Sequence, residues 1–194
     1  MAVSPFDNEV YYLRRTNSSN AGGLYRLEGQ LDSTRIAAIT NPAGLVADPV
    51  TGDLFVSEDF PGQVRRYAPD GSSNSFWLSG FLGGDDDPAG MSYIPSSYTG
   101  SLVTPGEMLL ADRGFNGLES LWTFSPATAQ SASFLLSEST RNDALYGCFT
   151  TKDKVIGVDS AIGLREMTGP PFVLGPALTT TPLVGMESAI CDSN

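Results

Sequence analysis

Apolar residues occur in short runs along this chain, and turn residues separate the runs. The clearest example lies between Gly44 and Gly71, where three such runs are bounded by Pro, Gly and Asp. Pro fixes φ near the value that many turns need, and Gly accepts a positive φ at little cost. The pattern therefore predicts three antiparallel β-strands joined by hairpins, and not a strand–helix–strand unit.

The same pattern recurs at a period of about 40 to 50 residues. First-strand positions align at Met1, Leu45, Met91, Tyr146 and Met186, at spacings of 44, 46, 55 and 40 residues. Four predicted strands per repeat at this period are typical of the blades of a β-propeller. One meander cannot bury both of its faces, whereas stacked blades cover one another. The sequence therefore predicts an all-β fold, a β-propeller of four-stranded antiparallel meander blades.

We expect a single propeller domain or propeller fragment, with about four blades plus one strand. Two interpretations stay open: the chain is a fragment of a five- or six-bladed propeller, or its last strand closes a four-bladed ring. The expected blades cover residues 1–40, 41–82, 83–139 and 140–182, with the start of a fifth over 183–194.

Apolar side chains on the predicted strands are expected to fill the layers between blades, and both tryptophans are assigned to this core. The longest repeat also carries an insertion over 95–105, whose Ser, Thr, Pro and Gly content predicts no packed structure of its own. The expected core positions are Leu54, Val56, Phe76, Leu78, Met108, Leu110, Leu121, Trp122, Phe134 and Leu136.

Composition narrows the function. The net charge of −11, from 22 acidic and 11 basic residues, argues against nucleic acid as a partner, because phosphate binding needs a basic surface. The chain has no histidine, which removes the commonest general base and the usual partner of a Ser or Cys nucleophile. No apolar run approaches the roughly 20 residues needed to span a bilayer. No signal peptide is visible in this chain.

Three consecutive acids, Asp85, Asp86 and Asp87, precede the first strand of the third repeat. Adjacent carboxylates repel one another, and a bound cation such as calcium would relieve that repulsion. The alternative interpretation is a solvated turn.

A second set of acids recurs at the ends of predicted second strands: Glu58, Asp59, Asp112 and Asp159. Recurrence at one structural position suggests a structural role, in which the acids cap turn N–H groups or pair with arginine. Equivalent strand ends of successive blades also lie on one face of a propeller. The alternative is therefore an acidic ring that binds a metal cation.

The two cysteines, Cys148 and Cys191, fall on predicted first strands of consecutive repeats. Such strands are neighbours around the central channel, so a disulfide between them is one alternative. A disulfide needs Cα atoms within about 7 Å, and two buried thiols are the other alternative. A nucleophilic role is not expected, because no histidine is present to activate either thiol.

The sequence GLVADPVTGDLFVSEDFPGQVRRYAPDG, residues 44–71, resembles the NHL-repeat propellers and the related gluconolactonase-like and strictosidine-synthase-like propellers. The resemblance implies a six-bladed fold, often extracytoplasmic, with the functional site at the central channel. NHL propellers are mostly interaction modules. Gluconolactonase-like propellers hydrolyse lactones or esters with a divalent cation, often calcium, held by Glu, Asn and Asp. The Glu-Gly-Pro motif of that group is absent here, and the only Asn-Gly, Asn116-Gly117, falls in a predicted turn.

We therefore expect a non-catalytic binding propeller, secreted or periplasmic, that contacts a protein or a glycan. A homo-oligomer that assembles through open blade edges is a variant of this hypothesis. The alternative is a calcium-dependent lactonase- or esterase-like hydrolase. No catalytic residue is assigned, and calcium is the one cofactor left open.

Overall fold

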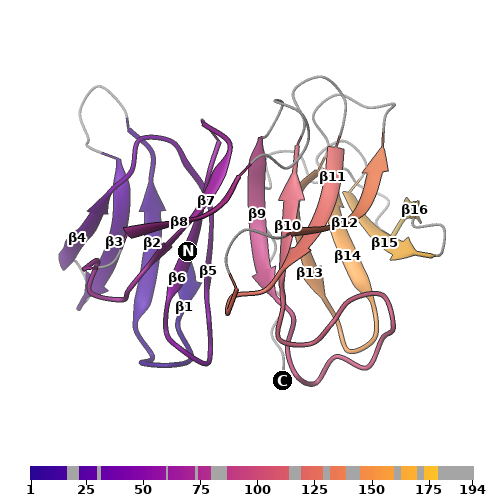
Figure 1. Ribbon diagram of the computed structural model, residues 1–194, viewed down its shortest axis with the longest axis horizontal. Coiled ribbons are helices and arrows are strands. Elements are labelled where there is room, and N and C mark those ends of the chain that lie inside the picture. Colours follow the sequence, from indigo (N-terminus) through magenta and orange to yellow (C-terminus); the bar gives the residue numbers. More distant parts are fainter. Residues whose placement is uncertain are drawn as a thin grey trace.

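The computed structural model of the chain describes residues 1–16, 22–29, 32–59, 61–72, 74–79, 87–113, 119–128, 132–138, 145–159, 163–169 and 173–178. These residues form four antiparallel sheets, each built from four strands that are consecutive in sequence (Figure 1). No helix occurs among them. The prediction of an all-β fold built from four-stranded meanders is confirmed.

The sheets follow one another along the chain. The first sheet contains β1 (Ala2–Val3), β2 (Val10–Arg14), β3 (Gly23–Glu28) and β4 (Asp32–Ala38), and the second contains β5 (Pro42–Ala47), β6 (Leu54–Glu58), β7 (Gln63–Tyr67) and β8 (Asn74–Ser79). The third contains β9 (Pro88–Tyr93), β10 (Met108–Asp112), β11 (Glu119–Phe124) and β12 (Ala132–Glu138). The fourth contains β13 (Leu145–Thr150), β14 (Val155–Asp159), β15 (Gly163–Thr168) and β16 (Val173–Ala177).

The first strands form the inner layer of the array. β5 packs on β9, and β9 packs on β13. The inner strands approach closely because glycine stands at the contact. A Cβ added at Gly90 of β9 would lie 2.7 Å from the carbonyl oxygen of Tyr146 and 2.9 Å from Cα of Gly147, both on β13. Spacing between sheets is therefore set by main-chain contact at this point.

Three apolar clusters fill the spaces between successive sheets, and β6 contributes to two of them. Leu54 and Val56 face the first sheet, while Phe55 points to the third and meets Trp77 edge-on, with ring centroids 5.6 Å apart. A strand buried on both faces reads as a continuous apolar run, as β6 does. The predicted core side chains within the described residues are all buried: Leu54, Val56, Leu78, Met108, Leu110, Leu121 and Trp122. The side chains of Phe76, Phe134 and Leu136 lie outside that part.

The insertion between β9 and β10 was predicted to have no packed structure of its own; it contains no strand, but it packs against the neighbouring sheets. Tyr98 is 4% exposed and Val103 is also buried, and both belong to the cluster between the third and fourth sheets. The amide of Thr99 donates to the carbonyl of Lys152 at 2.7 Å, which ties the insertion to the hairpin of the fourth sheet. Two apolar anchors outweigh the polar composition of the segment.

The first and fourth sheets lie at opposite ends of the long axis (Figure 1). Their described strands share no contact comparable to those between successive sheets. The described residues therefore form an arc of four stacked sheets. Residues 183–194, where the start of a fifth blade was predicted, and the predicted Asn116-Gly117 turn lie outside the described residues. No helix within the described ranges is long and apolar enough to cross a membrane.

Candidate functional site

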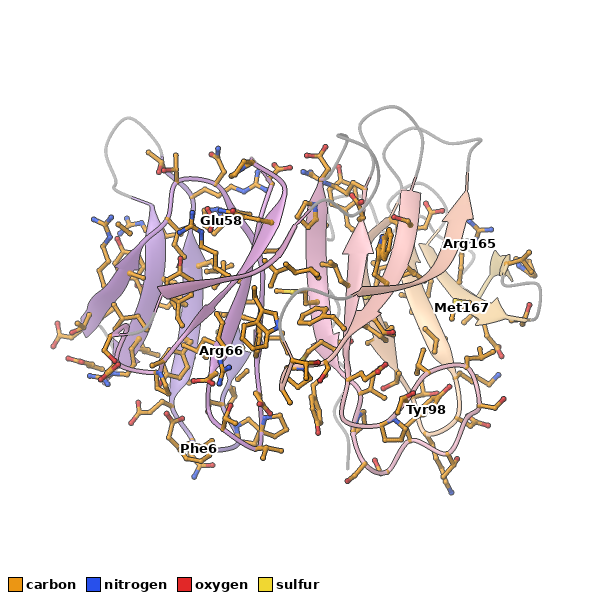
Figure 2. All side chains as sticks on the ribbon, in the orientation of Figure 1. Phe6, Glu58, Arg66, Tyr98, Arg165 and Met167 are labelled. Carbon is orange, nitrogen blue, oxygen red and sulfur yellow. The ribbon has the colours of Figure 1, made fainter. Side chains whose placement is uncertain are left out.

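Charged side chains from several sheets meet at one end of the array, around the ends of the second strands. Asp59 follows β6, Asp87 precedes β9 and Arg113 follows β10, while Arg15 follows β2. Glu58, the residue before Asp59, lies at the upper end in Figure 2. A small hollow opens there between the sheets; it is lined by Arg15, Ala43, Ala89, Gly90, Arg113 and Tyr146. We call this region the channel mouth.

Arg113 is the central contact of the channel mouth. Its Nη2 bonds to Oδ1 of Asp59 and lies 4.0 Å from Oδ1 of Asp87. Its guanidinium also lies over the ring of Tyr146, 5.2 Å from the ring centroid. The Arg113 amide donates to the carbonyl of Asp87 at 3.1 Å. One arginine thus joins the second, third and fourth sheets.

Arg15 brings the first sheet to the same place. Its Nη2 lies 3.6 Å from Oδ2 of Asp59, and its Nε donates to the carbonyl of Pro42 at 3.2 Å. The side chain is 52% exposed, so this ion pair contributes less than the Arg113 contact, which is largely shielded from solvent.

The carboxyl groups of Asp59 and Asp87 lie close enough to shift each other's pKa. Burial raises the pKa of Asp87 to about 7, helped by its hydrogen bond to Asp59 and by the negative charge there. Burial also acts to raise the pKa of Asp59, but hydrogen bonds with Asp87 and Arg113 outweigh it and hold that pKa below its ordinary value. Two carboxyls this close do not both ionise easily, so the pKa values of the pair move apart, with that of Asp87 raised and that of Asp59 lowered.

The other acids predicted at second-strand ends have partners within their own sheets. Glu58 pairs with Nε of Arg65 at 2.7 Å, and Asp159 pairs with Nη1 of Arg165 at 3.4 Å. Both arginines occupy the same register position, opposite the residue two before the acid. Burial raises the pKa of Glu58, and the positive charge of Arg65 opposes that shift.

Asp112 caps the start of the third sheet. Its Oδ1 accepts the amide of Asp87 at 2.9 Å, and its Oδ2 lies 3.4 Å from the donating hydroxyl of Ser120. Arginine pairing and capping of turn amides are the structural role predicted from the sequence for these strand-end acids.

Calcium does not fit these residues well. It takes six to eight oxygen ligands, and the carboxylates of the channel mouth already bind guanidinium, hydroxyl or amide donors. Within the described part of the chain, no three acidic or cysteine side chains are arranged to hold a metal ion. Asp85 and Asp86 lie outside that part, so their calcium site stays a prediction.

Cys148 is buried on β13, and its thiol lies 3.8 Å from the carbonyl of Gly90. Burial raises the pKa of this thiol well above its ordinary value, which makes the thiolate rare. It has no disulfide partner among the described residues. Cys191 lies outside them, and the predicted disulfide stays a prediction.

The opposite end of the array presents apolar side chains to solvent. Phe6, in the turn between β1 and β2, is 57% exposed, and Val50, in the turn between β5 and β6, is 71% exposed. The Phe6 ring lies against Gly52, whose φ of 79° suits glycine. Phe6 and Tyr98 both lie at the lower end in Figure 2, away from Glu58. We call Phe6 and Val50 the hairpin patch.

Sequence reasoning missed several of these residues. It did not single out Arg15, Tyr146, Phe6 or Val50 for a site. A signal for the hairpin patch was present, because each residue directly follows a proline within a turn, where a large apolar side chain has no strand to pack against.

No protein-family model and no curated protein matches this sequence. Solved structures do match the fold. An auxiliary nutrient binding protein from Bacteroides thetaiotaomicron VPI-5482 aligns with a TM-score of 0.63 and 12% identity, over 88% of this chain and 45% of that one. One from Bacteroides ovatus ATCC 8483 aligns with a TM-score of 0.61 and 10% identity, over 87% and 44%. A chain of the nidogen–laminin complex aligns with a TM-score of 0.59 and 14% identity, over 75% and 51%.

The likeness shows the fold class, which is that of the β-propellers, as the sequence predicted. This chain spans about half the length of the solved structures that it matches. At such low identity the likeness carries fold alone. The resemblance to the NHL-repeat and gluconolactonase-like families therefore stays a prediction.

Proposed function

We propose that this chain is a non-catalytic binding propeller, acting outside the cytoplasm, that contacts a protein or a glycan through its hairpin end. The observation that carries the proposal is the hairpin patch, where two large apolar side chains stand in solvent on adjoining turns. Exposed apolar groups that cluster on a rigid surface mark interaction sites more often than isolated ones do.

The two ends of the array differ in a way that supports this choice. At the channel mouth, the charged side chains of Asp59, Asp87 and Arg113 are engaged with one another. At the hairpin end, Phe6 and Val50 lack such cover. The packed insertion adds a firm surface to the same end, because Tyr98 anchors it in the core. Binding to a preformed surface avoids the cost of ordering a loop.

The solved structures add support of a general kind. One match is a chain of a complex between nidogen and laminin, and two are described as auxiliary nutrient binding proteins. The absence of histidine from the sequence also fits a binding role better than acid–base catalysis. Location outside the cytoplasm rests on the family resemblance.

The proposal is tested with a glycan array and a panel of purified secreted proteins as probes. Wild-type protein is compared with the double variant Phe6→Ser/Val50→Ser. The matched control is Val173→Ser/Leu178→Ser, which removes two exposed apolar side chains from the fourth sheet. We expect the hits to be lost in the hairpin variant and kept in the control. Hits that survive the hairpin variant would refute the hairpin end as the contact surface.

Self-assembly is the variant of this function that the arc supports. Met1 and Val3, at and beside β1, are exposed, and the described first and fourth sheets share no contact comparable to those between successive sheets. Covering such a face against a second copy would bury apolar surface. Light scattering of the 194-residue chain measures this directly: a discrete oligomer supports assembly, and a monomer of 20.5 kDa contradicts it.

A further inference from the structure

The acids and arginines of the channel mouth alternate in space. Asp59 belongs to the second sheet and Asp87 to the third, and the guanidinium of Arg113 reaches both. In the gluconolactonase-like propellers that the sequence resembles, a divalent cation held by acidic and amide oxygens is expected at the channel. In this chain, a side chain of the protein brings positive charge to that place.

We propose that the guanidinium of Arg113 takes the position of a metal cation between Asp59 and Asp87, so that the channel mouth is held together by an internal cation and does not bind calcium. The bond from Nη2 to Asp59 and the 4.0 Å approach to Asp87 place the charge between two sheets. The Tyr146 ring, 5.2 Å away, backs the guanidinium from the fourth sheet.

Electrostatics favour the guanidinium over an added metal ion. A calcium ion placed between the two acids would meet the positive charges of Arg113 and Arg15 within a few ångströms, and like charges at such distances repel strongly where water is partly excluded. Calcium would also have to replace donors that already satisfy Asp59 and Asp112. The guanidinium of Arg113 is always charged, bonds directly to Asp59 and lies within ion-pair distance of Asp87.

The same arrangement recurs elsewhere in the array, which argues that it is a property of the fold. Arg65 forms an ion pair with Glu58, and Arg165 forms one with Asp159, at matching register positions of the second and fourth sheets. Arg113 differs from these two because its partners belong to different sheets. Its charge therefore contributes to contact between sheets and not to one sheet alone.

The experiment compares wild-type protein with Arg113→Gln, and uses Arg66→Gln as the matched control. Arg66, on β7, also bonds to an acid, which is Asp53 in the turn between β5 and β6. Calcium binding is measured as the difference in melting temperature between protein in excess calcium and protein in chelator. Terbium binding is measured as terbium luminescence excited through a nearby tyrosine.

We expect no calcium-dependent melting shift in wild-type protein or in Arg66→Gln. We expect Arg113→Gln to melt at a lower temperature than wild-type protein and to regain stability with calcium. Adding Asp59→Asn to Arg113→Gln should abolish the regained stability.

Two results would overturn the proposal. One is a saturable terbium signal in wild-type protein that Asp59→Asn or Asp87→Asn abolishes. The other is an Arg113→Gln protein that folds and whose melting temperature does not change with calcium. If Arg113→Gln does not fold, the wild-type titration and its two aspartate variants decide the question alone.

Discussion

The spacing of the inner strands offers the sharpest test of the packing described above, through the substitution Gly90→Ala. A Cβ at this position would lie 2.7 Å from the Tyr146 carbonyl oxygen and 2.9 Å from Gly147 Cα, whereas ordinary contacts begin at 3.4 Å. Both neighbours are main-chain atoms, so no side chain can rotate away. β9 and β13 would have to separate by about 0.5 to 0.7 Å, the difference between these distances.

Overpacking of this kind costs about 1 to 3 kcal/mol. Alanine has fewer conformations than glycine in the unfolded chain, and this difference stabilises the folded protein by about 0.4 to 1 kcal/mol. From the midpoints of these two ranges, we expect Gly90→Ala to lower the free energy of unfolding by about 1.3 kcal/mol. The control is Gly175→Ala on β16, where the one close atom among the described residues is the Glu166 carbonyl oxygen at 3.3 Å.

Urea unfolding followed by tryptophan fluorescence measures both variants, because Trp77 and Trp122 are buried in the core. The midpoint should fall for Gly90→Ala at an unchanged m-value and stay near wild type for Gly175→Ala. A Gly90→Ala protein as stable as its control would refute main-chain contact as the determinant of sheet spacing.

Three further predictions address the insertion, the raised pKa of Asp87 and assembly. Tyr98→Ala should lower the free energy of unfolding by about 3 to 5 kcal/mol, as expected for a buried aromatic. Thr104→Ala in the same segment should change that free energy little. Equal effects of the two substitutions in urea titrations would contradict the packed insertion. The folded pKa of Asp87, about 7, lies above its unfolded value of 3.8, so its stabilising contribution is complete below about pH 4 and is lost as the pH rises to about 7. Urea midpoints should therefore fall from pH 5 to pH 8 and fall less in Asp87→Asn; an identical slope in both proteins would rule out this group as the cause. Light scattering with and without chelator should give one mass, and a mass that changes on calcium removal would contradict the internal cation at Arg113.

Much of the fold was readable from the sequence because strand formation depends on local pattern. The apolar run Leu54-Phe55-Val56 predicted a strand buried on both faces, and its side chains do enter two different clusters. Turn residues such as Gly52 and Gly62 adopt the positive φ that their type allows. These features follow from the residues themselves and their immediate neighbours.

The candidate site was readable only in part. The strand-end acids Glu58, Asp112 and Asp159 were found from their recurrence, because a repeat places them at one structural position. The sequence predicted that these acids pair with arginine or cap turn N–H groups. It did not identify the partner of each acid, because that depends on strand register and on which sheets adjoin. The meeting of Asp59 with Arg113, 54 positions apart in the chain, cannot be read from local pattern.

The sequence by itself determined the strands, their grouping into repeats and the apolar layers, because these depend on residue type at short spacing. Tertiary structure decided that Tyr98 anchors an apparently polar insertion, that Arg113 joins three sheets and that Phe6 and Val50 stay in solvent. The physical reason is the same in each case. Burial and charge pairing depend on distances between segments remote in sequence, and those distances exist only once the sheets have packed.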